Sequence, residues 1–294
     1  MKACYYAAFA AALAVSAVLA ASGGEREICR GEAPSVSPDG RQLAFMRLDG
    51  HRYAVHVRNI QDGTERQASQ AGFKAIGPRW RADGALAYSA GNETKSAYLA
   101  RNDKTGWNIY LAKDGRTEKL TSGRVRHTCP SFGPDGSLYF VSDATDGADT
   151  ASIQRRDASG GFSTCVPSAD PRAMFGDPSV SPDGRRLLRA EAGAYHRPWR
   201  IVVSPVDDGV KRTFLTGVDM AAYAPAWSPD GRRIAFTGCR EGDDGWQVYL
   251  MSADGGGMVR VAKGRNPAFA PDGATLYYDR DGRIWSIEIG GEAQ

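Results

Sequence analysis

Histidine is the side chain that most often carries acid–base or metal chemistry near neutral pH, and this chain of 294 residues contains only four. His51 and His56 lie at or within a stretch that alternates like a strand, and His196 lies in a polar loop. His127 stands two residues before Cys129, at the start of a phrase that the sequence repeats. We therefore take His127 as the histidine with a candidate role in binding or catalysis.

Motifs that would specify a reaction are missing from the sequence. It contains no His-Glu-x-x-His pair, no phosphate-binding loop, no dinucleotide fingerprint and no Gly-x-Ser-x-Gly nucleophile elbow. Its cysteines form no Cys-x-x-Cys pair of the kind that holds zinc. We therefore expect neither a metal ion nor a cofactor, and we name no catalytic residue.

One phrase recurs six times and indicates how the candidate residues are positioned. It reads Ala-Pro-Ala-Trp-Ser-Pro-Asp-Gly at residues 224–231, and diverged copies occupy residues 33–40, 77–84, 129–136, 177–184 and 266–273. The final glycines of successive copies are separated by 44, 52, 48, 47 and 42 residues. This spacing fits the period of a propeller blade made of four antiparallel strands.

Each part of the phrase has a place in such a blade. In the fifth copy, Pro225 to Trp227 predicts a short first strand whose tryptophan faces the neighbouring blade. Ser228 to Gly231 predicts a hairpin turn in which the glycine takes the left-handed conformation. Arg233 to Phe236 alternates like a half-buried second strand, and two further strands follow.

The sixth copy supplies only three strands. Residues 26–29, Arg-Glu-Ile-Cys, precede the first copy at the place where a fourth strand would end. Because an unpaired strand edge invites aggregation, we predict that this N-terminal strand completes the last blade. The predicted fold is all-β, a six-bladed β-propeller of four-stranded antiparallel blades closed by the N-terminal strand.

The first residues are predicted to form a secretory signal peptide. Lys2 precedes an uncharged apolar stretch, and small residues follow it, so we assign residues 1–22 to the signal and 23–294 to the propeller. A membrane anchor is disfavoured because the stretch is short and rich in alanine. We expect a periplasmic or secreted monomer with no membrane span after signal removal. The net charge of +3, without a basic run, argues against nucleic-acid binding.

Four cysteines remain once the signal is removed, namely Cys29, Cys129, Cys165 and Cys239. In an oxidising compartment an even number permits disulfides, and four buried free thiols are an equally good alternative. If one bond forms, we expect it between Cys29 and Cys239, which the predicted blades place on the same rim.

The repeated phrase, followed by strands such as Val-Tyr-Leu-Met-Ser-Ala-Asp-Gly-Gly, resembles the WD40-like PD40 repeats of the TolB family. The resemblance spans nearly all of residues 25–294 and implies a propeller that binds other proteins. TolB carries an α/β domain before its propeller, whereas here the signal runs almost directly into the first blade. We therefore expect a stand-alone TolB-like propeller. Related repeats in oligogalacturonate lyases imply an alternative, a carbohydrate-active enzyme with a site in its funnel.

The stretches before the six first strands differ between copies, and variation on a repeated scaffold is where a site is expected. These stretches converge on one mouth of the axial channel. Their mixed charges suit an envelope or secreted protein partner, so we favour a non-enzymatic protein–protein interaction module over the lyase-like alternative. The predicted binding residues are Glu32, Arg126, His127, Asp177, Tyr223 and Arg265.

Overall fold

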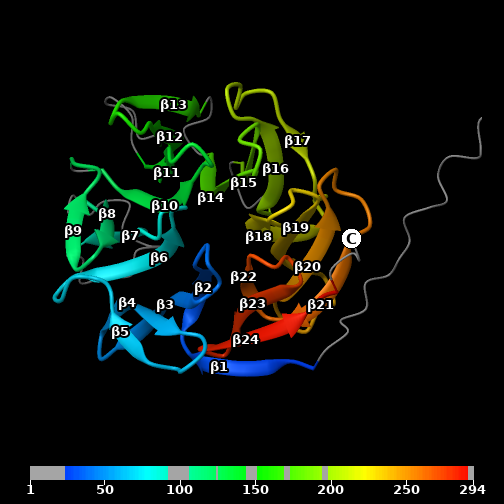
Figure 1. The fold of residues 1–294 in the computed structure, drawn as a ribbon. Coiled ribbons are helices and arrows are strands. Elements are labelled where there is room, and N and C mark those ends of the chain that lie inside the picture. The colour runs from blue at the N-terminus through cyan, green and yellow to red at the C-terminus, as the bar shows by residue number, and fades with distance from the viewer. Residues whose placement is uncertain are drawn as a thin grey trace, which may run out of the picture.

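The structure is a computed structural model that describes residues 24–91, 106–123, 125–143, 151–168, 173–193 and 198–290. These residues form six four-stranded sheets arranged as blades around a central axis (Figure 1). The six-bladed β-propeller predicted from the repeats is therefore confirmed. The predicted signal peptide, residues 1–22, lies outside the described residues.

Each blade has four strand positions, counted outward from the axis. From blade one to blade six, the innermost strands are β2 (Glu32–Val36), β6 (Lys74–Trp80), β10 (His127–Phe132), β14 (Met174–Val180), β18 (Met220–Trp227) and β22 (Arg265–Phe269). The second strands are β3 (Gln42–Asp49), β7 (Leu86–Gly91), β11 (Leu138–Ser142), β15 (Arg186–Ala192), β19 (Arg233–Arg240) and β23 (Thr275–Arg280). The third strands are β4 (Arg52–Asn59), β8 (Asn108–Lys113), β12 (Ser152–Arg156), β16 (Arg200–Pro205), β20 (Gln247–Ser252) and β24 (Arg283–Glu288). The outermost strands are β5 (Glu65–Gln67), β9 (Arg116–Lys119), β13 (Phe162–Val166), β17 (Thr213–Phe214), β21 (Val259–Lys263) and, in blade six, β1 (Arg26–Arg30).

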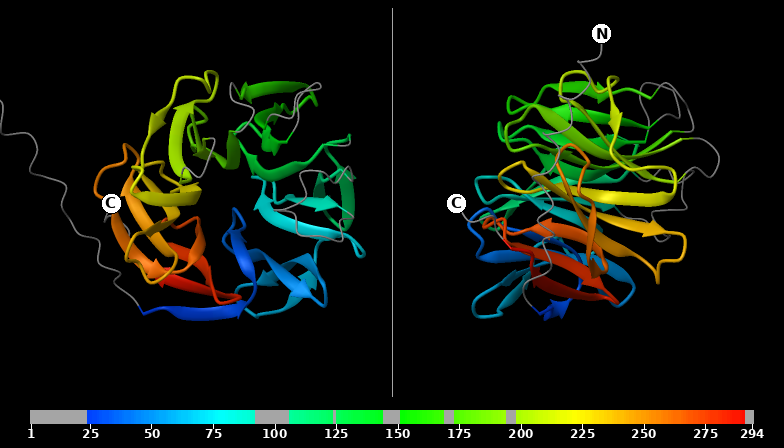
Figure 2. Two further views of the ribbon diagram at one scale, coloured as in Figure 1. Left: turned by 180° about the vertical axis from the view of Figure 1, so that it is seen from behind. Right: turned by 90° about the vertical axis from the view of Figure 1, so that its right-hand side faces the viewer.

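The N-terminal strand closes the ring, as predicted. β1 pairs antiparallel with β24, so the blue and red ends of the chain lie side by side in Figure 1 and again in both views of Figure 2. Ion pairs fasten the N-terminal segment to blade six. Arg283 of β24 contacts Glu27 of β1, and Arg280 at the end of β23 lies 2.8 Å from Glu25, just before β1. The edge that β24 would otherwise expose is thereby covered.

The six Asp-Gly turns lie on one face of the ring, which we call the turn face. All six phrase glycines have φ between 67° and 80°, the left-handed conformation expected of them. In blade five the backbone N–H of Gly231 donates to the carbonyl of Ser228 at 2.9 Å. Asp230 accepts from the backbone N–H of Arg232 at 3.0 Å and from the Ser228 hydroxyl. The aspartate therefore holds its own turn.

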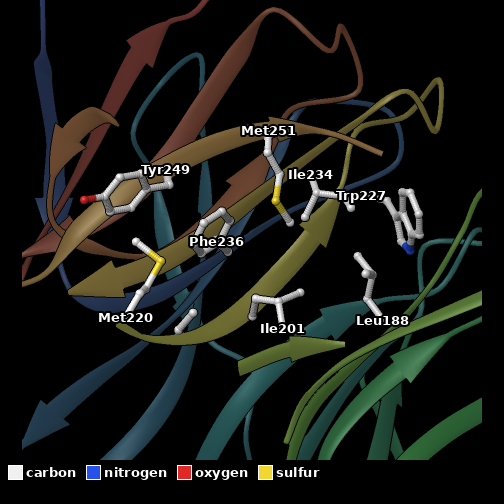
Figure 3. Packing of buried hydrophobic residues seen from close by; sticks show 9 residues of the cluster. Leu188, Ile201, Met220, Trp227, Ile234, Phe236, Tyr249 and Met251 are labelled. Atoms are coloured by element: carbon white, nitrogen blue, oxygen red, sulfur yellow. The ribbon is translucent and has the colours of Figure 1, made fainter. Parts of the chain in front are cut away.

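Apolar side chains fill the junctions between blades. Figure 3 shows the junction of blades four and five, where Leu188 and Ile201 meet Trp227, Phe236 and other residues of blade five. The indole N–H of Trp227 donates across the junction to the carbonyl of Ser179 at 3.1 Å. The tryptophan of the repeated phrase faces the neighbouring blade, as expected, and joins the two blades by packing and by a hydrogen bond.

Each innermost strand contains a bulge at the residue before its proline, where the pairing register shifts. The bulge residues have φ between 48° and 62°. Only one of the six is glycine, although this conformation is costly for other residues. They are Ala33, Gly77, Cys129, Asp177, Ala224 and Asn266.

The backbone N–H groups of five of these six bulges are hydrogen-bonded across the blade junctions. At five of the six junctions, a side chain of the preceding blade accepts the bond. The pairs are Ala33 with Asp279 (2.9 Å), Gly77 with the Met46 sulfur (3.2 Å), Asp177 with the Cys129 sulfur, Ala224 with Asp177 (3.1 Å) and Asn266 with Thr237 (2.8 Å).

The acceptor comes from one of two positions in the blade. Met46, Thr237 and Asp279 share one register position in the second strand, opposite the residue that precedes the bulge. Where that position holds Val141 or Ala190, which cannot accept, the bulge residue of the same blade supplies the acceptor. Ser89 holds the position in blade two, and its hydroxyl has no hydrogen bond to any described residue.

The predicted Cys29–Cys239 disulfide is not formed. All four described cysteines are free. Cys29 packs between blades six and one against a cluster that includes Leu43 and Phe45, whereas Cys239 pairs with Ala221 in blade five. The thiol of Cys29 therefore faces blade one, away from its proposed partner. Within the described ranges there is no helix of the length and apolar character needed to cross a membrane.

Candidate functional site

The innermost strands begin on the face opposite the turns, which we call the mouth face. At the register position just before the bulge, the six blades present different residues around the channel. Blades five, six and one carry Tyr223, Arg265 and Glu32, which we call the charged sector. Blades two, three and four carry Ile76, Thr128 and Gly176, the neutral sector. Three of the six predicted site residues are thus brought together on adjacent blades.

A buried carboxylate that the sequence analysis did not identify lies beneath the charged sector. Asp279 is fully buried, and its Oδ1 lies 3.4 Å from the Nε of Arg265. Its Oδ2 accepts from the backbone N–H of Ala33 at 2.9 Å and from the Asn266 side-chain amide at 2.6 Å. Burial raises the pKa of Asp279 despite these donors. Asp279 therefore links blades six and one and fixes the guanidinium of Arg265.

Glu32 is half-buried in the same sector. Its two carboxylate oxygens each lie 3.4 Å from the hydroxyl of Tyr53, a long contact. Burial raises the pKa of Glu32, and the nearby Asp279 carboxylate raises it further, while Arg265 opposes the shift. No cationic side chain among the described residues comes within 4 Å of Glu32, so its charge is the least compensated in the sector.

Tyr223 supplies an aromatic wall next to these charges. Its ring packs edge-on against Trp246, with 4.9 Å between the ring centres and an angle of 82° between the planes. Tyr223 lies near Arg265 on the adjacent blade. With Asp279 beneath it counted in, the charged sector therefore combines one guanidinium, two carboxyl groups and aromatic rings.

Asp177 lies at the edge of this sector. It is the bulge residue of blade four, and its Oδ2 accepts from the backbone N–H of Ala224, the residue that follows Tyr223. Burial raises the pKa of Asp177, although the Arg79 guanidinium acts in the opposite direction. Asp177 thus has a structural role at a junction as well as a place near the channel.

The other two predicted residues do not join the charged sector. Arg126 is paired with Asp143, with 3.6 Å between Nε and Oδ2. His127 is buried, its ring packs edge-on against Phe140, and its Nε2 lies 3.3 Å from the carbonyl of Ser122. Burial lowers the pKa of His127. Its side chain therefore belongs to the junction between blades two and three rather than to the channel.

The described residues contain no group of three or more histidine, cysteine, aspartate or glutamate side chains placed to hold a metal ion. The chemistry that the charged sector offers is therefore ionic and aromatic contact with a ligand. Two carboxyl groups of raised pKa also lie close together there, which is the kind of pairing used in acid–base sites.

No protein-family model matches the chain. It is 30% identical over 213 residues to an uncharacterized protein of Agrobacterium fabrum, covering 71% of this chain and 66% of that protein. It is also 34% identical over 111 residues to a TolB homolog of Chlorobium luteolum, and 33% over 86 residues to the Tol-Pal system protein TolB of Francisella tularensis. These matches cover 37% and 28% of this chain, and it spans only 23% and 19% of those two proteins.

Solved structures share the fold. A putative TolB from Agrobacterium tumefaciens aligns over 89% of this chain and 90% of its own, with a TM-score of 0.63 and 18% identity. An oligogalacturonate lyase from Vibrio parahaemolyticus aligns over 91% of this chain and 92% of its own, with a TM-score of 0.57 and 12% identity. At these identities the likeness concerns the fold alone.

Proposed function

Since this chain is a TolB-like six-bladed propeller, we propose that it is a non-enzymatic interaction module of the periplasm or of secreted material, which binds a protein partner at its mouth face. One observation carries the proposal. A single register position on three adjacent blades holds Tyr223, Arg265 and Glu32, whereas the turn face repeats one aspartate-centred turn. Repeated side chains serve the scaffold, and those that differ at equivalent positions are available for recognition.

The composition of the charged sector supports a protein partner. Aromatic rings and arginine are the side chains that contribute most to protein–protein binding energy. The names of the curated relatives point the same way, since one of them is assigned to a Tol-Pal system. We extend that to this chain as a proposal of protein binding, and propose a periplasmic location on the same ground.

The position of His127 counts against the lyase-like alternative. His127 was its candidate acid–base group, and the ring of His127 is enclosed by Phe140 and the Ser122 carbonyl in a blade junction. The paired carboxyl groups of Glu32 and Asp279 are the remaining feature that favours chemistry in the funnel. The experiment below therefore tests for enzymatic activity as well as for protein binding.

The test is crosslinking capture from periplasmic extract with three purified proteins. The wild type, Tyr223→Ala at the mouth and Arg185→Ala on the turn face are compared, with melting temperatures measured for each. We expect Tyr223→Ala to lower capture of a specific protein by about tenfold, and Arg185→Ala to leave it unchanged. Equal capture by all three would contradict the proposal. Cleavage of oligogalacturonate by the wild type, lost in Glu32→Gln, would establish the enzymatic alternative instead.

A further inference from the structure

We propose that the charged sector receives a positively charged side chain of the partner, a lysine ammonium or an arginine guanidinium, and that Glu32 is its carboxylate ligand. The inference rests on the proposed function and names the chemistry of the group that enters the mouth. It is carried by the balance of charges and hydrogen bonds around Glu32, Asp279 and Arg265.

The single cation of the sector is already engaged. Arg265 is paired through its Nε with Asp279, a fully buried carboxylate that needs this compensation. Glu32 is then left with the hydroxyl of Tyr53 as its hydrogen-bond donor, at 3.4 Å from each oxygen. The sector therefore holds two carboxylates against one guanidinium, and the uncompensated charge is on the more accessible carboxylate.

The hydrogen bonds of Asp279 show the same deficit. Its Oδ2 has two donors, from Ala33 and Asn266, but its buried Oδ1 has only the long contact of 3.4 Å with the Nε of Arg265. A buried charged oxygen with only one long contact is unfavourable. A cation brought next to Glu32 would reduce the repulsion between the two carboxylates and stabilise both in their ionised forms.

The raised pKa values of Glu32 and Asp279 agree with this geometry, because they mean that the surroundings disfavour negative charge. The rings of Tyr53 and Tyr223 offer apolar contact for the methylene groups that carry a lysine or arginine head group. A carboxylate entering the mouth would instead approach two like charges, which is costly in a partly buried site.

The experiment uses four short blocked peptides as probes, Ac-Gly-X-Gly-NH2, with lysine, arginine, norleucine or glutamate at X. Each is titrated into protein carrying 13C-labelled tyrosine and tryptophan, and the NMR shifts of the Tyr53, Tyr223 and Trp246 rings are followed. We expect saturable shifts with lysine or arginine but not with norleucine or glutamate. Glu32→Gln should weaken binding by about tenfold, and Glu288→Gln, the same change on an exposed residue at the turn face, should have no effect.

The proposal is overturned if the glutamate peptide binds and that binding is lost in Arg265→Gln, since the mouth would then accept an anion. It is also overturned if no peptide binds, or if Glu32→Gln binds the lysine and arginine peptides as well as the wild type does. Glu32→Asp, which keeps the charge, should retain most of the binding. The two proposals fail separately: protein capture that depends on Tyr223 but is unchanged in Glu32→Gln would preserve the proposed function and remove this inference.

Discussion

The turn face and the mouth face of the propeller use acidic side chains in opposite ways. On the turn face, hydrogen bonds from the Ser37 and Ser181 hydroxyls hold the pKa values of Asp39 and Asp183 below their ordinary value. On the mouth face, burial raises the pKa values of Glu32, Asp177 and Asp279. The turn carboxylates are thus stabilised as anions by their own loops, whereas burial disfavours the anionic forms of the mouth carboxylates.

This difference indicates which acidic residues have only a structural role. The turn aspartates are satisfied within three residues of chain, so they can be copied with the blade. The mouth carboxylates depend on groups from other blades, such as Ala33 and Ala224, and leave part of their charge unmatched. Substitutions on the two faces test this distinction.

The largest effect is expected for Asp279→Ala. The change leaves the Ala33 N–H, the Asn266 amide and the Arg265 guanidinium without their shared acceptor at the junction of blades six and one. We expect the free energy of unfolding, measured in urea, to fall by about 3 kcal/mol. Asp279→Asn keeps one oxygen for the Ala33 N–H and should lose less. A variant as stable as the wild type would mean that Asp279 does not hold this junction.

A smaller loss is expected for Asp230→Ala on the turn face. The exposed Arg232 N–H loses its acceptor, whereas the buried Ser228 hydroxyl keeps the carbonyl of Arg233 as an acceptor at 3.1 Å. We expect the free energy of unfolding to fall by about 1 kcal/mol, with partner affinity per folded molecule unchanged. Arg185→Ala is the control on the same face. Loss of affinity in folded Asp230→Ala would break the division between the two faces.

The two faces should also respond oppositely to pH. The folded-state pKa values of Glu32 and Asp279 lie above their unfolded-state values. At a pH between the two values the folded protein therefore binds more protons than the unfolded chain. The free energy of unfolding consequently rises as the pH falls through the folded-state pKa values. The lowered pKa values of Asp39 and Asp183 give stability that is present above their unfolded value and is lost as pH falls through the folded-state value. Urea unfolding of the wild type between about pH 7 and pH 3 should show both trends.

Variants separate the two pH effects. Glu32→Gln combined with Asp279→Asn should flatten the gain in stability on mild acidification, and Asp39→Asn combined with Asp183→Asn should reduce the loss at lower pH. If the mouth variant changes only the low-pH loss, the assignment of the raised pKa values to the mouth is wrong.

The smallest effect on stability is expected for Glu32→Gln alone. The residue is half-buried, its only described hydrogen-bond donor is the distant Tyr53 hydroxyl, and its charge faces Asp279. We expect the free energy of unfolding to change by less than about 0.5 kcal/mol. Thermal unfolding beside Glu288→Gln measures this. A large fall in the free energy of unfolding would show that Glu32 stabilises the fold rather than being available to bind a partner.

The sequence was sufficient for the fold because its signals are local. A turn such as Ser228 to Gly231 is specified by four neighbouring residues, and the fixed period repeats it around the ring. The closing strand could also be predicted, since the last blade lacked one strand and residues 26–29 supplied it. The orientation of Trp227 followed from the alternation of a short strand.

The candidate site was less accessible from sequence, because its contacts join distant parts of the chain. Asp279 bonds to Ala33 across 246 positions, and no local pattern records that pair. A signal did exist: with the six copies aligned, Asp279 is the only charged residue in a set that also contains Met46, Ser89, Val141, Ala190 and Thr237. His127 does not occupy the register position just before the bulge, because that position belongs to its neighbour Thr128.

The bulges have a consequence for how such a ring can evolve. At five of the six junctions the donor is a backbone N–H, which every copied blade carries whatever its sequence. A blade can therefore be duplicated beside any other, provided that it keeps one acceptor at either of two positions. Blade six holds polar side chains at both, Asn266 and Asp279. In such a blade, a substitution can remove one of the two polar side chains while the other still accepts the hydrogen bond of the neighbouring bulge N–H. The acceptor position can therefore change during evolution without loss of that bond.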